Sequence, residues 1–406
     1  MTILHTADWH LGHLLYENQR TGEQMSFLAQ IAGIAAERRP DVFILAGDVY
    51  DTDNPSVDTV KMFNDAMLAL HDAVPSMTIV VIAGNHDSYR RLEVNNALWR
   101  RLGVHVVGVV ARTENGLADL DKHIIPVRAD DGSTKAFVLA VPHAFPQNFP
   151  LVDASDCERR LRPARFFEAL CKRAQELDEC GLPVILTAHL AVGGSDLAGH
   201  DEFVGFQENF PQDIFGDYPD YVALGHIHKP QTFANGKIRY AGTPVAVSFD
   251  EKYPHSVSLV TIDRHGGIPI IESIEIANPH PLVTIPGQGF LPLDEAMACL
   301  EAYPAEKEDY LRMNILPSGF AVAEIASRAA AICKDKKSRF CVVNVKRKET
   351  AAQNGEKEAM TVEEFKKMSP IEVARMYYRK QEGTDMPGTF RDDLEELMAG
   401  MSQSGQ

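Results

Sequence analysis

The sequence predicts an α/β (α+β) fold in which a mixed β-sheet is covered by helices. Along the first quarter of the chain, apolar β-prone runs alternate with stretches whose apolar residues recur at helical spacing. Two of these runs, 42–46 and 78–83, are apolar apart from Thr78, which is typical of strands covered on both faces. Strand signals become more frequent further along, so we expect a mixed sheet rather than a purely parallel one.

The individual elements follow from these patterns in chain order. Phe27, Ile31 and Ile34 lie on one face of the first helix, and Asn235-Gly236 is typical of a hairpin turn. The expected strands cover residues 2–7, 42–46, 78–83, 104–110, 135–141, 184–188, 221–224, 237–240 and 256–262. The expected helices cover residues 23–39, 56–70, 92–102 and 156–178.

A change in composition near Pro279-His280-Pro281 indicates a domain boundary. We expect a first domain at residues 1–278, a small α+β domain at 279–350, and a linker with a helical tail at 351–406. The tail helices are short and amphipathic, and their pattern fits docking on a partner as well as folding back on the chain. The expected elements of the small domain are helices at 293–303 and 321–333 and strands at 310–316 and 340–345.

Composition limits the class of protein. The chain has 406 residues, of which 45% are hydrophobic, enough for a buried core in more than one domain. The formal net charge of −17 disfavours attraction of the whole surface to nucleic acid, although a local basic patch or bound cations remain compatible with it. We expect neither a transmembrane helix nor a secretory signal, because no apolar run reaches 18 residues and the chain starts on a strand-like run.

The cysteines indicate a reducing compartment. None of the six forms a Cys-x-x-Cys pair, and their scatter does not suggest a disulfide framework. We expect free thiols in a cytoplasmic protein. The six are Cys157, Cys171, Cys180, Cys299, Cys333 and Cys341.

Five clusters of metal-ligating residues each follow an apolar run. Asp, Asn and His side chains are ligands for hard to borderline divalent cations. Open α/β sheets bind ligands at the C-terminal ends of their strands, so five such ends could converge on one crevice and hold two ions. That arrangement is suited to attack on a phosphate ester. The clusters are Asp8-Trp9-His10, Gly47-Asp48, Gly84-Asn85-His86-Asp87, His189 and Gly225-His226-Ile227-His228.

The chemistry of the side chains suggests roles within these clusters. Residues two apart on a strand face the same side, so Asp8 with His10 could meet one ion, as could His226 with His228. The Asp48 carboxylate, which follows a glycine, has two oxygens and could bridge two ions. Three neighbours complete the set: Asn85 offers an amide oxygen, His86 is a plausible acid or electrostatic group, and Asp87 could orient an imidazole.

In this order the clusters resemble the calcineurin-like metallophosphoesterase superfamily, and within it the bacterial SbcD family of DNA-repair nucleases. The resemblance extends over about residues 1–275 and is weaker in the small domain and tail. It implies a β-sandwich flanked by helices, a capping domain and a helical tail. The segments that carry it are 3–13 (ILHTADWHLGH), 45–52 (LAGDVYDT), 83–88 (AGNHDS), 220–231 (DYVALGHIHKPQ) and 239–251 (RYAGTPVAVSFDE).

The resemblance also implies a ligand set for two ions, which the family usually fills with manganese. The first ion would be held by Asp8, His10, Asp48 and His228, and the second by Asp48, Asn85, His189 and His226. Iron, zinc or cobalt would suit the ligand types equally well. His86 would contact the scissile phosphate and assist the leaving oxygen, with Asp87 holding its orientation. Archaeal relatives carry a second histidine where this chain has Asp51, so that role is not carried over, and Asp51 would hold a ligand or a loop in place.

The expected substrate, DNA as double-stranded ends, hairpins or single strands, also comes from the resemblance, with exonuclease and endonuclease action in repair and recombination. Basic groups are candidate phosphate contacts. These are Arg90, Arg91, Arg100, Arg101, Lys336, Lys337, Arg339, Lys346, Arg347 and Lys348, with Tyr16 and Arg20 as further candidates.

The family's tail binds the coiled coil of an SbcC-type ATPase, and its nuclease domain dimerises, so we expect a homodimer within a heterotetramer. The dimer contact should involve the helices at 56–70 and 92–102. The candidate docking face for the ATPase consists of Val362, Phe365, Ile371, Tyr377, Tyr378, Phe390, Leu394 and Leu397.

Two alternatives use the same residues differently. A phosphodiesterase for a small molecule or cyclic nucleotide would share the metal site but would need neither the small domain nor the tail. A catalytically inactive, partner-binding subunit would need the tail but not an intact ligand set with His86.

Overall fold

The computed structural model describes residues 1–129, 131–155, 158–199 and 209–346, and the single residues 375, 376, 378 and 386. It divides into two compact units, Met1–Ile315 with Phe320–Asn344, and Leu316–Gly319 with Val345–Gln406. Nearly the whole predicted tail, including its docking face apart from Tyr378, lies outside the described residues, as do Cys157, Arg347 and Lys348. The predicted domain boundaries remain predictions.

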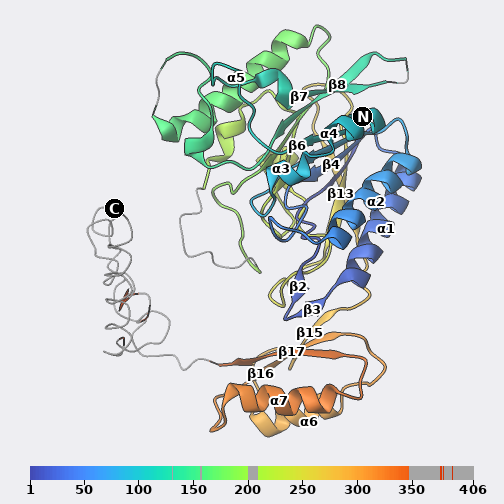
Figure 1. Cartoon of the computed structure of the whole chain (residues 1–406), viewed down its shortest axis with the longest axis vertical. Helices are drawn as coiled ribbons and strands as arrows, with labels where there is room; N and C mark the ends of the chain where they lie inside the picture. The colour runs from blue at the N-terminus through green and yellow to red at the C-terminus, as the bar shows by residue number, and fades with distance from the viewer. Residues whose placement is uncertain are drawn as a thin grey trace. The chain divides into compact units, whose positions relative to one another are not determined.

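Two six-stranded sheets form the centre of the first unit (Figure 1). In each sheet four neighbouring strands are parallel, and antiparallel strands flank them. The first sheet runs β14 (Ile270–Glu275), β13 (Ser256–Thr261), β1 (Thr2–Thr6), β4 (Val42–Ala46), β5 (Thr78–Ile82) and β6 (Val104–Val107). The second runs β11 (Gln231–Phe233), β12 (Ile238–Tyr240), β10 (Tyr221–Gly225), β9 (Val184–His189), β8 (Thr134–Val141) and β7 (Ile124–Arg128).

The two sheets pack face to face, and helices cover their outer faces. Ile44 and Ile82 of the first sheet share one apolar core with Ile185 of the second. On the outer faces, α1 (Thr21–Arg38) and α2 (Val57–Ala73) cover the first sheet, and α5 (Arg162–Leu177) covers the second. This confirms the sandwich flanked by helices. It also explains the runs without polar residues, because a strand between a sheet and a helix is buried on both sides.

Most predicted elements are confirmed to within a few residues, but one helix is not. Instead of a helix over 92–102, the chain forms α3 (Tyr89–Leu92), α4 (Asn96–Trp99) and a 3-10 turn (Arg100–Leu102). Two side chains hold the chain against β6: the Asn96 amide donates to the carbonyl of Val106, and the Glu93 carboxylate accepts from the backbone of Gly108. These bonds to the following strand segment favour two short helical turns over one continuous helix. A second difference is the start of α5, which begins at Arg162 rather than at 156 and has Pro163 in its first turn.

Sequence patterns missed the edge strands β7, β11 and β14. Pro126 interrupts β7, and β14 is largely exposed, with Glu272, Ser273 and Glu275 between and after its isoleucines. A short hairpin, β2 (Leu14–Leu15) with β3 (Asn18–Gln19), was not predicted either.

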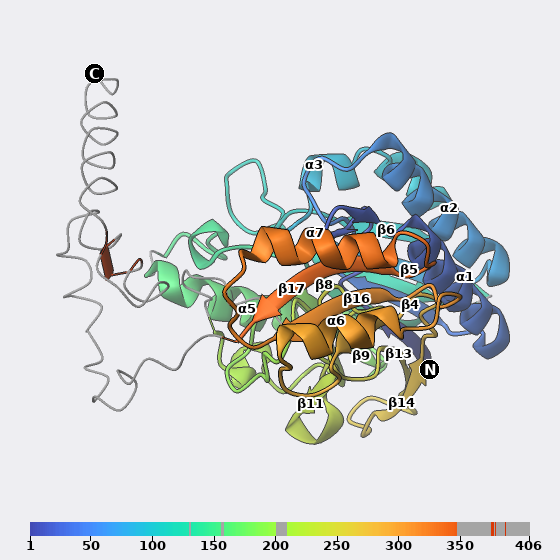
Figure 2. The same cartoon turned by 90° about the horizontal axis from the view of Figure 1, so that it is seen from below.

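A smaller α/β module follows, formed by β15 (Leu282–Ile285), α6 (Leu293–Glu301), β16 (Tyr310–Ile315), α7 (Val322–Cys333) and β17 (Arg339–Val345). Its strands pair in the order β15-β16-β17, and both helices lie along the same face of this sheet (Figure 2). All four elements predicted here are confirmed, and β15 is an addition. Arg312 of β16 contacts the loop before β13. It donates to the carboxylate of Asp250 at 2.8 Å and to the carbonyl of Phe249 at 3.2 Å.

Two further properties concern chemistry and environment. Cys171, Cys180, Cys299, Cys333 and Cys341 are free thiols. Within the described ranges, none of the helices combines the length and apolar character that crossing a bilayer would require.

A close approach of the two sheets at Gly225 predicts that one added methyl group strongly destabilises the fold. A Cβ at Gly225 would lie 1.9 Å from the backbone oxygen of Ala46, so Gly225→Ala must push β10 away from β4. We expect this variant to lose about 3 kcal/mol of unfolding free energy, measured by chemical denaturation. The matched control is Gly33→Ala on the exposed face of α1, because a Cβ at Gly33 would meet nothing within 4 Å. It should gain about 0.5–1 kcal/mol, and equal stability of the two variants would contradict the packing argument.

Candidate metal centre

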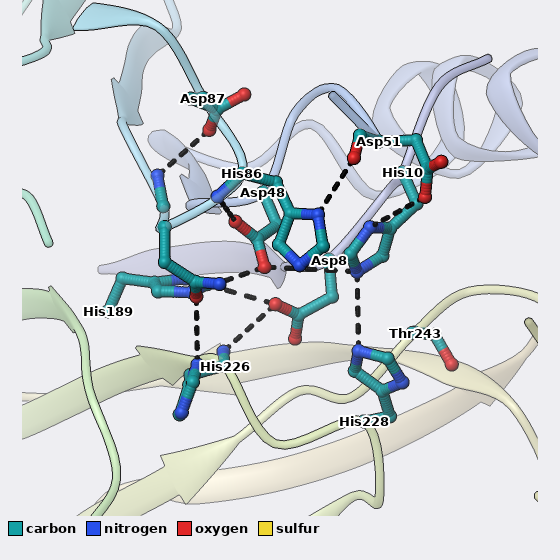
Figure 3. A network of polar contacts seen from close by, with 12 residues as sticks. Asp8, His10, Asp48, Asp51, His86, Asp87, His189, His226, His228 and Thr243 are labelled. Atoms are coloured by element: carbon teal, nitrogen blue, oxygen red, sulfur yellow. Dashed lines mark hydrogen bonds and ion pairs between the residues drawn. The ribbon is translucent and has the colours of Figure 1, made fainter. Parts of the chain in front are cut away.

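The residues predicted as ligands gather where β1, β4, β5, β9 and β10 end, in the gap between the two sheets (Figure 3). The backbone turns sharply after these strands. Asp8, His10 and Asp48 all have positive φ, of 54°, 44° and 48°, and His226 has a φ of 96°. Such residues cost about 1–3 kcal/mol each. Backbone bonds compensate, since the amides of Asp8 and His10 donate to the carbonyls of Gly47 and Asp48 at 3.0 Å.

This backbone corrects the reasoning from period-two spacing. β1 ends at Thr6 and β10 at Gly225, so neither Asp8 with His10 nor His226 with His228 lies on a regular strand. Left-handed turns, rather than strand alternation, bring these side chains to the site.

The Asp48 carboxylate lies at the centre of the cluster. Its Oδ2 is 3.3 Å from Nε2 of His189 and 3.8 Å from Nε2 of His10, and its Oδ1 accepts from the backbone amide of His86 at 2.9 Å. On one side of it, Nε2 of His10 lies 3.2 Å from Nε2 of His228. One buried carboxylate therefore faces imidazoles on two sides, as a bridging ligand must.

The other side of the cluster is built around an amide oxygen. Oδ1 of Asn85 lies 2.9 Å from Nε2 of His189 and 3.0 Å from Nδ1 of His226. Asp8 accepts from the backbone amide of His226 through Oδ1, while its buried Oδ2 has no hydrogen-bond partner among the residues that the structure describes. A buried carboxylate oxygen without a partner is costly, and a cation would satisfy it.

Two groups of side chains have ligand atoms within 4.8 Å of one another, and Asp48 belongs to both. One group is His10, Asp48 and His86, and the other is Asp8, Asp48 and His189. The donor set thus fits two adjacent divalent cations. His86 is a member of the first group and could itself bind a cation, although the resemblance gives it a catalytic role.

The buried carboxylates of the cluster favour the protonated forms of the histidines beside them. Burial alone would lower the pKa of His10, but the carboxylates of Asp51, Asp48 and Asp8 raise the pKa to about 9. Burial would also lower the pKa of His189, but its neighbours, Asp48 above all, raise this pKa to about 9. Although burial acts in the opposite direction, the same imidazoles hold the pKa of Asp48 well below its usual value. Protons on His10 and His189 therefore neutralise carboxylates that bound cations would otherwise neutralise.

The loop residues Asp51 and Asp87 have distinct positions. Nδ1 of His86 lies 2.7 Å from the backbone oxygen of Asp51, whose carboxylate lies 3.4 Å from Nδ1 of His10. Asp87 instead accepts from the backbone amides of Val49, Tyr50 and Gly84 at 2.8–3.1 Å. The structure therefore corrects the expectation that Asp87 orients the His86 ring: the Asp51 carbonyl does so, and Asp87 ties two loops together.

Sequence patterns missed three residues around the site. His13 lines a cavity of about 130 Å³ together with His10, Asp48 and His86. Nδ1 of His143 lies 3.4 Å from the His189 carbonyl. Burial lowers the pKa of both His13 and His143 to about 4, so they remain neutral near the charged cluster. The third is Glu251, whose carboxylate lies 2.9 Å from Nδ1 of His228. Glu251 closes a segment that carries the family resemblance, but isolated acidic residues give no further signal.

The candidate DNA contacts divide into two kinds. Arg90, Arg91, Arg100, Arg101 and Lys337 are exposed, as is half of the Tyr16 side chain. The expectation for Arg20 is wrong, because Arg20 is 3% exposed, donates to the carbonyl of Ala246 at 2.6 Å and pairs with Glu23. Lys336 is half-buried and donates to backbone carbonyls, whereas Arg339 and Lys346 are exposed. Arg339 donates to the hydroxyl of Tyr310, and the exposed Lys337 pairs with Glu306.

Comparison with known proteins gives consistent matches. The calcineurin-like phosphoesterase family model matches residues 1–230. The chain is 34% identical over 364 residues to the SbcD subunit of the SbcCD nuclease from Rhodobacter capsulatus, covering 86% of this chain and 89% of that protein. Identity to the SbcD subunit of Escherichia coli K12 is 30%, covering 71% of each chain. For the SbcD subunit of Bacillus subtilis 168 it is 32%, covering 64% of this chain and 66% of that one.

The raised pKa values predict how stability depends on pH without metal. His10 and His189 have a pKa of about 9 in the folded chain against an ordinary 6.5, so their stabilisation is complete below pH 6.5 and lost as pH rises through about 9. We expect the melting temperature in EDTA to fall between about pH 6.5 and 9.5. Asp48→Asn removes a carboxylate that raises both values and should flatten this fall, whereas an equal fall in the variant would contradict the assignment.

Proposed function

Because this chain belongs to the SbcD family of calcineurin-like phosphoesterases, we propose that it is a metal-dependent DNA nuclease. It hydrolyses phosphodiester bonds, and its action includes exonuclease and endonuclease cleavage of double-stranded ends, hairpins and single strands. The observation that carries this proposal is the buried Asp48 carboxylate, shared by two groups of candidate ligands next to the unpartnered Asp8 Oδ2. A phosphodiester is the substrate class suited to paired cations.

We propose that the centre holds two divalent ions and that both are manganese, a metal that suits mixed oxygen and nitrogen ligands. When bound, such ions polarise the phosphodiester and lower the pKa of a coordinated water. The ligands of one ion would be Asp8, His10, Asp48 and His228, and those of the other would be Asp48, Asn85, His189 and His226.

The chain's own contribution is to place an imidazole beside the scissile bond. Nδ1 of His86 is engaged by the Asp51 carbonyl, so Nε2 is the nitrogen left for a substrate. In that position His86 contacts the phosphate and gives a proton to the leaving oxygen, as a general acid does. Asp51 acts on both sides, since its carbonyl fixes the His86 ring and its carboxylate faces His10.

DNA as the substrate and an SbcC-type ATPase as the partner rest on the relatives, which are named as nuclease subunits of SbcCD. The exposed arginines directly after the His86 loop, Arg90 and Arg91, support phosphate binding near the site. Arg100 and Arg101 are also exposed, but they precede the start of β6, at the end of the sheet away from the metal centre. We further propose that the tail at residues 351–406 binds the coiled coil of the ATPase, and that the nuclease forms a homodimer within a heterotetramer.

His86→Ala separates catalysis from metal binding. We expect manganese-dependent cleavage of hairpin DNA to fall by about 10²–10⁴-fold, because a general acid is lost. Elemental analysis should still find two ions per chain, since the proposed ligands are intact. Asp48→Asn is the matched control and should lose metal and cleavage together.

The wild-type protein also tests the choice of substrate. Incubation with hairpin DNA and with a cyclic nucleotide, both in manganese, should give cleavage of the DNA. Turnover of the cyclic nucleotide alone would replace the nuclease with a small-molecule phosphodiesterase. Metal binding without turnover of either would favour a partner-binding subunit.

A truncation tests the proposed partner. A chain ending at residue 355 should fail to pull down the coiled-coil ATPase, because the proposed docking helices are missing. Its manganese-dependent hydrolysis of a small phosphodiester should match that of the full chain, which shows that the nuclease domain is intact. Retained binding of the ATPase would disprove docking through the tail.

A further inference from the structure

Glu251 is a buried acid next to the candidate metal centre. Its side chain is 0% exposed, and Oε1 lies 2.9 Å from Nδ1 of His228. The other oxygen, Oε2, accepts from the hydroxyl of Thr243 at 3.1 Å and from the backbone amide of Val247 at 3.3 Å. Both oxygens are therefore engaged, and the carboxylate has a fixed orientation.

This contact determines which nitrogen of His228 faces the site. A neutral imidazole carries a proton on one nitrogen and a lone pair on the other. Because a carboxylate only accepts hydrogen bonds, Nδ1 of His228 must carry the proton toward Glu251. Nε2 then presents its lone pair, and this is the atom that lies 3.2 Å from Nε2 of His10 inside the cluster.

The support of His228 differs from that of His189. Nδ1 of His189 lies 2.9 Å from the backbone carbonyl of Ala46, which is a neutral acceptor. His228 instead faces a full negative charge. A carboxylate behind an imidazole makes the opposite nitrogen a stronger donor to a cation.

Two arginines fix the loop that ends at Glu251. Arg20 donates to the carbonyl of Ala246 at 2.6 Å, and Arg312 donates to the carbonyl of Phe249 and the carboxylate of Asp250. Both arginines are buried. The position of Glu251 is thus set by contacts on each side of the loop.

We propose that Glu251 is a positioning residue of the metal centre, which holds His228 as the Nδ1-protonated tautomer and strengthens Nε2 as a metal ligand. The inference rests on the proposed function, because it takes His228 to be a ligand. It adds a residue to the centre that neither metal-ligand patterns nor the family resemblance assigned.

Glu251→Gln tests the charge while preserving the shape of the side chain. We expect the affinity for Mn²⁺, measured by titration calorimetry on the full chain, to fall by about 10–100-fold. The wild type should bind two ions in the same titration. A second pair of variants tests the route of the effect: Glu251→Gln should weaken binding much less in a His228→Gln background, because contacting residues are not additive.

Asp220→Asn is the matched control. Asp220 is also a buried carboxylate, and it lies 3.0 Å from Nδ1 of His265 and accepts from the amides of Val184 and Gly266. It lies where β9 and β10 begin, whereas the metal centre lies where they end. This variant should lower the melting temperature and leave Mn²⁺ affinity unchanged.

Each outcome decides a different claim. Weaker binding in Glu251→Gln, with normal binding in Asp220→Asn, supports the proposal. Wild-type affinity in Glu251→Gln, or equal weakening in both variants, overturns the role of Glu251 and leaves the two-metal function intact. A wild type that binds no Mn²⁺ overturns the proposed function and this inference with it.

Discussion

The close approach of the two sheets at the ends of β4 and β10 is the constraint on which the candidate metal centre depends. Gly225 sits where a methyl group would overlap the backbone of Ala46, and a Cβ at Gly84 would lie 2.1 Å from Oδ1 of Asp48. Without side chains at these two positions, loops from both sheets meet around one carboxylate. Donors from strands far apart in sequence therefore share a space that no single sheet edge would provide.

The cost of this convergence is electrostatic, because several carboxylates and imidazoles are buried together. The carboxylates raise the pKa values of His10 and His189 and the imidazoles lower that of Asp48, so these side chains stabilise one another by ion pairing. Paired charges make burial tolerable, and a cation would satisfy Oδ2 of Asp8, which has no hydrogen-bond partner among the described residues. The site is thus held in a form that is ready to exchange protons for cations.

The sequence was informative where the chemistry is local. Residue type and order were enough to predict a mixed sheet covered by helices and the clusters of side chains that meet at its strand ends, since each cluster follows a buried strand, whereas the sandwich of two sheets was implied by the family resemblance. Contacts between distant segments were not predictable. The partner of His86 is a backbone carbonyl, Glu251 reaches His228 across a loop, and Arg20 is buried against Ala246 rather than exposed. Side-chain bonds to β6 likewise broke the helix expected at 92–102.

The hydrogen bonds from Arg312 to residues 249 and 250 connect the smaller α/β module to the loop that ends at Glu251, and through Glu251 to the metal centre. Arg312 of β16 binds residues 249 and 250, and the next residue, Glu251, holds His228. A rigid-body rotation of the module would therefore have to break the arginine contacts or carry Glu251 with it. If a bound substrate displaced the module, Glu251 and the His228 ring would therefore move with it.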